Sequence, residues 1–151
     1  MKISLIQNLE AMGGARYYRE DGGFSQYLYR QVGQTFYYGG LKCKIIEKTT
    51  GQNSHDGLPL YSNTSDVYLR IDPDSGKVGQ ARVYKDRKAA LDFDWDREHK
   101  NFPKGVVHVH EYEEVDGKLR RKPGEPRLMT DEEIEKYGPI LKQADPDVKF
   151  R

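Results

Sequence analysis

The strongest constraint on the fold lies between residues 67 and 115, where four short segments alternate apolar and polar side chains. Turn-forming residues separate these segments, such as the Asp-Pro-Asp-Ser-Gly run at 72–76. Because the side chains of a strand point alternately to the two faces of a sheet, the pattern predicts strands at residues 67–71, 78–85, 89–95 and 106–115. Their short connections predict an antiparallel meander with one apolar face and one polar face.

The segments on either side of this meander complete the expected fold class. Residues 41–48 begin with the same alternation and predict a further strand. Residues 130–133 form a capping box that predicts a C-terminal helix, which we expect Pro139 to kink or break. We therefore expect an α+β fold with a four- to five-stranded antiparallel meander, a C-terminal helix and an N-terminal aromatic-rich helical or strand segment.

Two stretches lack a regular pattern. The tyrosine-rich residues 17–38, within an N-terminal segment 1–55, indicate either a packing layer or a base-stacking or protein-binding patch. Residues 49–66 are rich in Ser, Thr, Asn, Gly and Asp and predict the longest loop. This loop is our candidate hinge between the N-terminal segment and the rest.

Length and composition set the outer limits of the prediction. A chain of 151 residues suits a single domain, residues 1–151. Its 25 basic and 24 acidic residues balance, so net charge does not identify a partner. Cys43 is the one cysteine, which excludes an intramolecular disulfide and a thiolate metal cluster and predicts a small buried apolar residue. Since the sequence contains neither a secretory signal nor a membrane-spanning apolar run, we expect a cytoplasmic protein without a membrane partner.

The polar face of the expected meander gathers chemically useful side chains. Alternation places them on one side of three consecutive strands, opposite an apolar face that we expect to receive the helices. The candidates are Arg82, Asp92, Asp94, His108, His110 and Tyr112.

One interpretation of this face is general acid–base chemistry on RNA. Histidine holds either protonation state near neutral pH, so His108 and His110 suit the roles of base and acid. The guanidinium of Arg82 would stabilise charge on the phosphate. Asp92 or Asp94 would orient a histidine or raise its pKa. Such a mechanism requires neither a metal nor another cofactor.

Two other interpretations stay open. Histidines at i and i+2 of a strand point the same way, so His108 and His110, with His99 and an aspartate, could bind zinc or another divalent ion. Alternatively, the same residues are solvent-facing polar side chains with modest cross-strand pairing.

A basic segment follows the last expected strand at residues 117–127. It is either a solvated loop or a surface that binds a phosphate backbone. In the second case the substrate-binding candidates are Arg120, Arg121 and Lys122, together with Tyr112 on the polar face.

Residues 56–151 carry a pattern found in a known group of proteins. It consists of Asp-x-Asp-Trp-x-x-x-His at 92–99, Phe-Pro-Lys-Gly-Val-Val-His-Val-His-Glu-Tyr at 102–112 and Thr-Asp-Glu-Glu-Ile-Glu-Lys-Tyr-Gly at 130–138. The pattern resembles the C-terminal toxin modules of bacterial and prophage polymorphic toxins, including modules fused to phage minor head proteins. Some of these modules are ribonucleases with a barnase-like helix-plus-meander layout. The resemblance implies RNA as substrate, a cognate immunity protein as partner, and functional residues at Asp92, Asp94, His99, His108 and His110.

From these observations we expect metal-independent RNA cleavage, with His108 and His110 as acid and base and Arg82 on the phosphate. Two alternatives remain: a non-enzymatic phage-type interaction or inhibitor protein that binds a host protein, and a metal-dependent hydrolase that uses the His-x-His site. The chain starts with its own Met1 rather than with a delivery protein, which keeps the free-standing binding role open.

Overall fold

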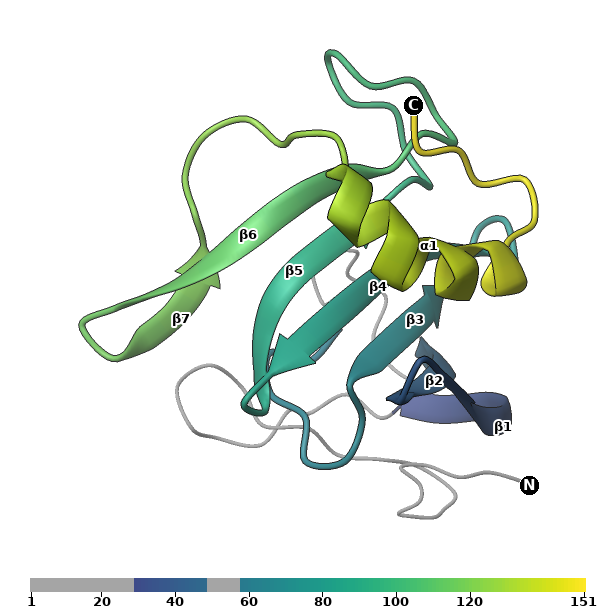
Figure 1. Ribbon diagram of the computed structural model, residues 1–151, viewed down its shortest axis with the longest axis horizontal. Helices are drawn as coiled ribbons and strands as arrows, with labels where there is room; N and C mark the ends of the chain where they lie inside the picture. The colour runs from purple at the N-terminus through teal and green to yellow at the C-terminus, as the bar shows by residue number, and fades with distance from the viewer. Residues whose placement is uncertain (1–28, 49–57) are drawn as a thin grey trace.

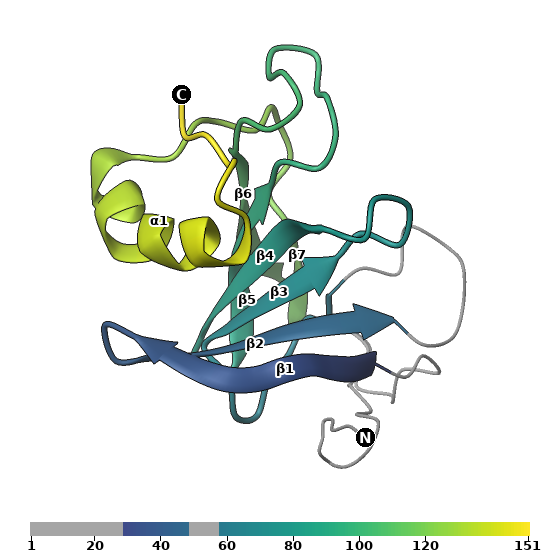
Figure 2. The same ribbon diagram turned by 90° about the vertical axis from the view of Figure 1, so that its right-hand side faces the viewer.

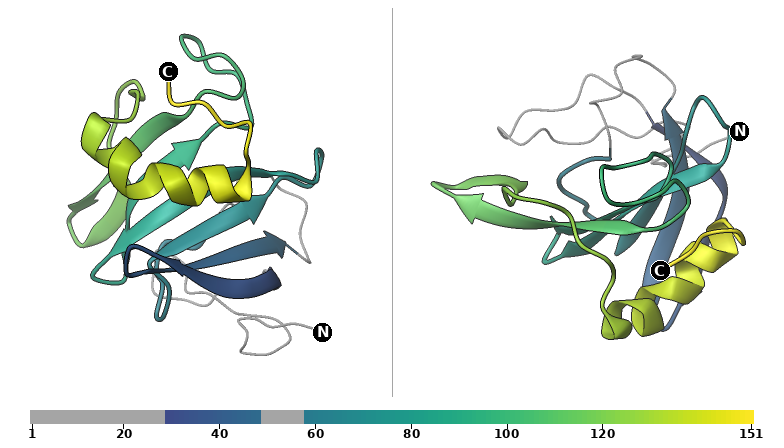
Figure 3. Two further views of the ribbon diagram at one scale, coloured as in Figure 1. Left: turned by 45° about the vertical axis from the view of Figure 1, so that its right-hand side comes forward. Right: turned by 90° about the horizontal axis from the view of Figure 1, so that it is seen from above.

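The computed structural model describes residues 29–48 and 58–151, which form a seven-stranded sheet with a helix packed on one face (Figure 1). The strands lie side by side in chain order. They are β1 (Tyr29–Tyr38), β2 (Leu41–Lys48), β3 (Val67–Ile71), β4 (Val78–Lys85), β5 (Lys88–Asp94), β6 (His108–Val115) and β7 (Lys118–Arg121). The helix α1 (Asp131–Ala144) follows β7, and Figure 3 shows it lying across the sheet. The α+β class is thus confirmed.

The sheet is mixed, which corrects the expected antiparallel meander of four or five strands. Strands β2 and β3 run parallel, whereas every other neighbouring pair in the described chain is antiparallel. A parallel pair needs a long connection that returns the chain to the end where it started. Residues 49–66 connect the two strands, and residues 58–66 are the described part of this connection. Its expected role as a hinge falls partly on residues 49–57, which lie outside the described residues.

The described part of the N-terminal aromatic segment is a strand rather than a helix. Strand β1 pairs with β2 through a turn at Gly39 and Gly40, both with positive φ, and a bulge lies between Val32 and Phe36. Glycine adopts positive φ without steric cost, so the two turn residues fix the hairpin. The expected tyrosine-rich packing layer also includes residues 17–28, which lie outside the described residues.

The first part of the basic segment after β6, Lys118–Arg121, is also a strand, which corrects the expected loop there, whereas residues 122–127 are not in a strand. Asp116 and Gly117 both have positive φ and form a two-residue hairpin turn, after which β7 pairs with β6. An Asp-Gly dipeptide after an alternating run is a strong hairpin signal, because both central residues of a type I′ turn need positive φ.

Helix α1 begins as expected and continues further than expected. Thr130 caps it in a reciprocal capping box with Glu133. The helix then runs through Pro139 to Ala144 without a break, so the expected interruption is wrong. A proline inside a helix costs about 3 kcal/mol. Burial of an Ile or Leu side chain stabilises by about 1.5–3 kcal/mol, and α1 buries both Ile140 and Leu141, so packing outweighs the lost hydrogen bond.

The apolar core fills the space between the sheet and α1 (Figure 2). Phe93 and Val109 of the sheet pack there with Ile140 of α1 and Val148 of the C-terminal tail, and Cys43 is fully buried in the same cluster. The expected assignment of an apolar face to the helix is confirmed. In the described part of the chain, no helix is both long enough and apolar enough to cross a membrane.

Part of the opposite face of the sheet is closed to solvent. A second cluster covers part of it, in which Leu58 packs with Tyr68, Tyr84 and Leu119. Asp92 is 0% exposed and Arg82 is 5% exposed on this face. The interpretation of these residues as solvent-facing is therefore wrong for Arg82 and Asp92.

Candidate functional site

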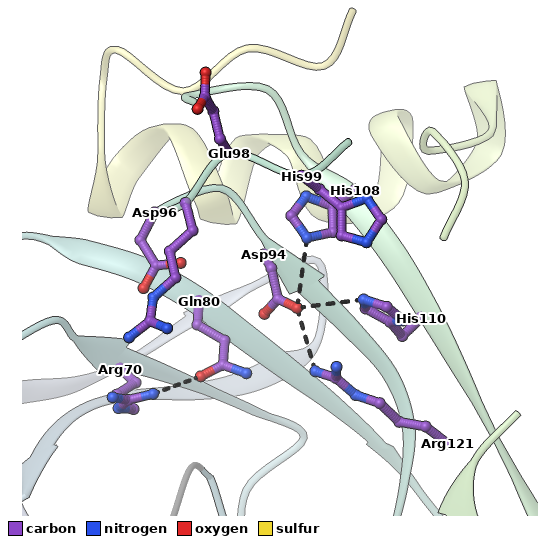
Figure 4. Close-up of a pocket in the computed structure, with 10 residues that line it drawn as sticks. Arg70, Gln80, Asp94, Asp96, Glu98, His99, His108, His110 and Arg121 are labelled. Carbon is purple, nitrogen blue, oxygen red and sulfur yellow. Dashed lines mark hydrogen bonds and ion pairs between the residues drawn. The ribbon is translucent and has the colours of Figure 1, made fainter. Parts of the chain in front are cut away.

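The candidate site is built on a row of four residues that lie directly opposite one another on β3, β4, β5 and β6. In strand register, Arg70 pairs with Gln80, Gln80 with Asp94, and Asp94 with His108. Cross-strand partners point to the same face of a sheet, so the four side chains line up (Figure 4). His110, two residues along β6, faces the same way.

Beside this row lies a buried cluster centred on Asp92. Its carboxylate accepts two hydrogen bonds from Arg82, from Nε at 2.5 Å and from Nη2 at 2.9 Å. The hydroxyl of Tyr112 donates to Asp92 Oδ2 at 2.7 Å and accepts from Arg82 Nη2 at 2.7 Å. Arg82 Nη1 donates to the carbonyl oxygens of Leu58 and Pro59. Burial alone would raise the pKa of Asp92, but the charge and hydrogen bonds of Arg82 outweigh it, so that pKa is lowered.

Arg121 joins this cluster to the site from β7. Its Nη2 lies 2.6 Å from Asp92 Oδ2 and 3.2 Å from Asp94 Oδ2. The Arg121 side chain is 40% exposed, whereas that of Arg82 is 6% exposed. Arg121 is therefore the cation of the pair that a ligand can reach.

Asp94, His108 and His110 converge on one point. The distance from Asp94 Oδ2 is 3.9 Å to His108 Nε2 and 3.8 Å to His110 Nε2. The ligand atoms of the three residues all lie within 4.8 Å of one another. Both distances exceed the 2.7–3.2 Å range of a hydrogen bond, so the carboxylate contacts neither imidazole directly.

The protonation states in this trio are set by burial. Desolvation, reinforced by His99 and Arg121, lowers the pKa of His108 to about 4. Desolvation together with Arg121 and His108 lowers the pKa of His110 to about 4. Burial and the neighbouring Asp92 raise the pKa of Asp94 to about 7. Both imidazoles are therefore neutral at neutral pH.

A cavity of about 370 Å³ opens onto this trio. Three arginines and two further carboxylates line it with the row and the histidines: Arg70, Arg97, Arg121, Asp96 and Glu98. His99 reaches the cavity from the loop after β5, and its ring centroid lies 5.5 Å from that of His108. The structure thus brings together five predicted site residues, namely Asp94, His99, His108, His110 and Arg121.

The other predicted site residues lie elsewhere. Arg82 and Tyr112 are engaged with Asp92 and do not line the cavity. Arg120 pairs with Glu113 at 3.0 Å on the exposed side of β7. Lys122 pairs with Glu111 at 3.1 Å and lines a separate cavity of about 160 Å³. Of the predicted phosphate-contacting residues, only Arg121 reaches the main cavity.

Sequence reasoning missed Arg70 as a site residue. The alternation of residues 67–71 already placed Tyr68 and Arg70 on one face, but only the β3–β4 register sets Arg70 beside Gln80. Arg97 and Glu98 belong to a loop whose path alternation does not predict.

No family model matches this chain, and no curated protein or solved structure matches it either. The resemblance to polymorphic toxin modules therefore stays a prediction.

Proposed function

We propose that this protein is a metal-dependent hydrolase that cleaves phosphodiester bonds of RNA, with Asp94, His108 and His110 as the metal ligands. The observation that carries the proposal is the convergence of three ligand atoms on one point at the mouth of a cavity. Two histidines and one carboxylate that leave open positions are a recurrent site for divalent transition metals.

The distances support an ion between the three side chains. Metal–nitrogen and metal–oxygen bonds to zinc are about 2.0–2.2 Å long, so two ligand atoms on one tetrahedral ion lie roughly 3.3–3.6 Å apart. The observed separations of 3.8 and 3.9 Å are too long for hydrogen bonds and close to this value. The three ligand atoms lie within 4.8 Å of one another, so the side chains would have to move inward to bind one ion.

The electrostatics of the trio support the same proposal. Imidazole binds metal in its neutral form, and burial keeps His108 and His110 neutral at neutral pH. A bound ion would lower the pKa of its water and polarise the phosphoryl oxygen. Arg121 would orient Asp94 and offer its exposed face to the phosphate. His99 would supply an imidazole for proton transfer in the same cavity.

Metal-independent RNA cleavage is the second candidate, and one observation favours it. The rings of His108 and His110 lie 5.6 Å apart, a separation that allows both to contact one phosphate. In that mechanism Arg121 takes the phosphate-binding role first assigned to Arg82. The guanidinium of Arg82 is buried and already bonded to Asp92, Tyr112 and two carbonyl oxygens, so it cannot contact a phosphate. The lowered pKa of both histidines weighs against this candidate, because one of them must be protonated to act as the acid.

One experiment separates these functions. Purified protein is incubated with RNA as isolated, after chelation, and after re-addition of Zn²⁺ or Mn²⁺. We expect cleavage that the chelator abolishes and the metal restores, and that Asp94→Asn, His108→Ala and His110→Ala each remove. Glu98→Gln is the matched control, because it neutralises a carboxylate of the same cavity outside the trio.

Other results of this experiment would favour one of the alternative functions. Chelator-resistant cleavage that still requires His108 and His110 would favour the metal-independent candidate. Absence of both cleavage and metal binding would overturn the enzymatic proposals. It would then favour a binding protein, for which the exposed Tyr37 and Tyr38 of β1 offer a contact surface.

A further inference from the structure

Arg70 is a buried arginine without an acidic partner. It is 9% exposed, and its Nη1 donates to the neutral amide oxygen of Gln80 at 2.9 Å. Its Nε is buried and has no hydrogen-bond partner. Among the described residues, no carboxylate forms an ion pair with Arg70, and Asp96 interacts with its charge only at longer range.

Two other arginines of the sheet near the cavity, Arg82 and Arg121, differ from Arg70 in this respect. Arg82 and Arg121 both contact the carboxylate of Asp92. Buried charges in proteins are normally paired, because removing an ion from water without a counter-ion is strongly destabilising. A buried guanidinium without an ion pair that lines a cavity is suited to bind an anion from solution.

Arg70 lies in the same cavity as the proposed metal centre, at a distance set by the strand register. Arg70, Gln80 and Asp94 follow one another in register across β3, β4 and β5. Neighbouring strands lie about 4.8 Å apart, so the backbone at Arg70 lies about 10 Å from that at Asp94. The same cavity connects the two, and Figure 4 shows Gln80 between Arg70 and Asp94.

We propose that Arg70 and Gln80 form a second phosphate subsite, which binds the phosphate next to the scissile one in an oligonucleotide. Guanidinium forks suit phosphate, and the Gln80 amide accepts from Arg70 through its oxygen while its NH₂ group remains a donor. The substrate class rests on the proposed function: it is a nucleic-acid chain with at least two consecutive phosphates.

The other charged groups of the cavity fit this assignment. Arg97 adds a third positive charge to those of Arg70 and Arg121. Asp96 and Glu98 oppose an anion. In Figure 4, Glu98 lies apart from the Arg70–Gln80 pair, whereas Asp96 lies close to it. Asp96 is the carboxylate that would weaken phosphate binding, so Asp96→Asn should tighten it.

The first test measures the affinity of inorganic phosphate for the chelator-treated protein from phosphate-dependent thermal melting. Arg70→Gln should weaken phosphate binding roughly tenfold or more, because it removes charge-assisted hydrogen bonds. Arg97→Gln is the matched control, since it removes the same charge from an exposed residue of the same cavity, and we expect less than about a threefold effect. Equal phosphate affinities in Arg70→Gln and the wild type would overturn the subsite.

The second test assigns the phosphate to a nucleic-acid chain. With metal present, kcat/KM is compared for a dinucleoside monophosphate and a trinucleoside diphosphate of RNA. The wild type should prefer the longer substrate, and Arg70→Gln should remove most of that preference. Loss of phosphate binding with an unchanged length preference would overturn the assignment to an oligonucleotide.

Two further measurements keep the outcomes distinct. Metal stoichiometry of Arg70→Gln should equal that of the wild type, because Arg70 contacts none of the three ligands. A protein that binds phosphate through Arg70 but neither metal nor RNA would refute the proposed function and leave the anion subsite standing.

Should Arg70→Gln fail to fold, Gln80→Ala tests the same subsite by removing one phosphate donor. Unchanged phosphate affinity in that variant would count against the subsite.

Discussion

Arg82 and Asp92 face each other on β4 and β5 as a buried pair joined by two hydrogen bonds, 2.5 and 2.9 Å long. Four other groups complete the arrangement: Tyr112 and Arg121 contact the carboxylate, and the carbonyl oxygens of Leu58 and Pro59 accept from the guanidinium. The pair thereby anchors the segment that covers this face of the sheet. Its role is to hold the scaffold beneath the site rather than to contact substrate.

Arg82→Met should therefore destabilise the fold strongly. Removing one partner of a buried pair leaves an uncompensated charge and typically costs about 3–5 kcal/mol. Urea unfolding measures this loss, with Arg120→Met as the control at an exposed pair, where we expect a loss below about 1 kcal/mol. The double variant Arg82→Met/Asp92→Leu should recover part of the stability. A loss at Arg82 as small as that at Arg120 would contradict this account.

The strands were predictable where one face of the sheet is apolar. Residues 41–48, 67–71 and 78–85 were predicted with their observed bounds, and 89–95 and 106–115 to within two residues at either end. The period-2 pattern is strong there because α1 and the core cover one face. Strand β1 was ambiguous because its aromatic doublet and its bulge interrupt the alternation.

The parallel pairing of β2 and β3 could not be read from the sequence. Alternation fixes which residues share a face, but it does not fix the direction of a neighbouring strand. The same limit applied to the site. Alternation placed Asp94, His108 and His110 on one face, whereas only the register showed that Arg70 continues their row and that Arg82 is occupied by Asp92.

The metal-free protein should become more stable when Asp94 is replaced by asparagine. Burial and Asp92 raise the pKa of Asp94 to about 7, well above its unfolded value, so its ionisation opposes folding at higher pH. In chelator at pH 8, Asp94→Asn should raise the free energy of unfolding by roughly 2–4 kcal/mol. The gain should shrink as the pH falls from 7 toward 4, because the folded wild type then keeps Asp94 protonated. Chemical unfolding at several pH values measures both effects, and a destabilised variant at pH 8 would contradict the prediction.

Divalent metal should stabilise the wild-type protein and not the ligand variants. A ligand that binds only the folded state adds about 1.4 kcal/mol for each tenfold increase of its concentration above its dissociation constant. Thermal melting with increasing Zn²⁺ or Mn²⁺ should therefore show a rising midpoint for the wild type and a flat one for His108→Ala and His110→Ala. Arg120→Met should behave like the wild type, since Arg120 lies outside the cavity. Equal metal responses in wild type and both histidine variants would exclude the trio as ligands.

Arg127 should determine much of the acid sensitivity of the fold. It donates to Glu111 of β6 at 2.9 Å and to both oxygens of Glu133 in the first turn of α1. Its hydrogen bond lowers the pKa of Glu111, and against the effect of burial it also lowers the pKa of Glu133. A carboxyl whose pKa is lowered by folding contributes stability above its unfolded pKa, and that contribution is lost as the pH falls through the folded value.

Arg127→Met should therefore destabilise the protein by about 1–2 kcal/mol at pH 7, since hydrogen bonds to charged groups contribute on this scale and the side chain is partly exposed. The difference from the wild type should narrow below about pH 4.5, where the glutamates become protonated in both proteins. Urea unfolding between pH 7 and pH 3 measures it. If the free energy of unfolding of the two proteins changed with pH in parallel, Arg127 would stabilise the β6–α1 contact by packing alone. Loss of an ion pair would instead leave a difference in stability that changes as the glutamates become protonated.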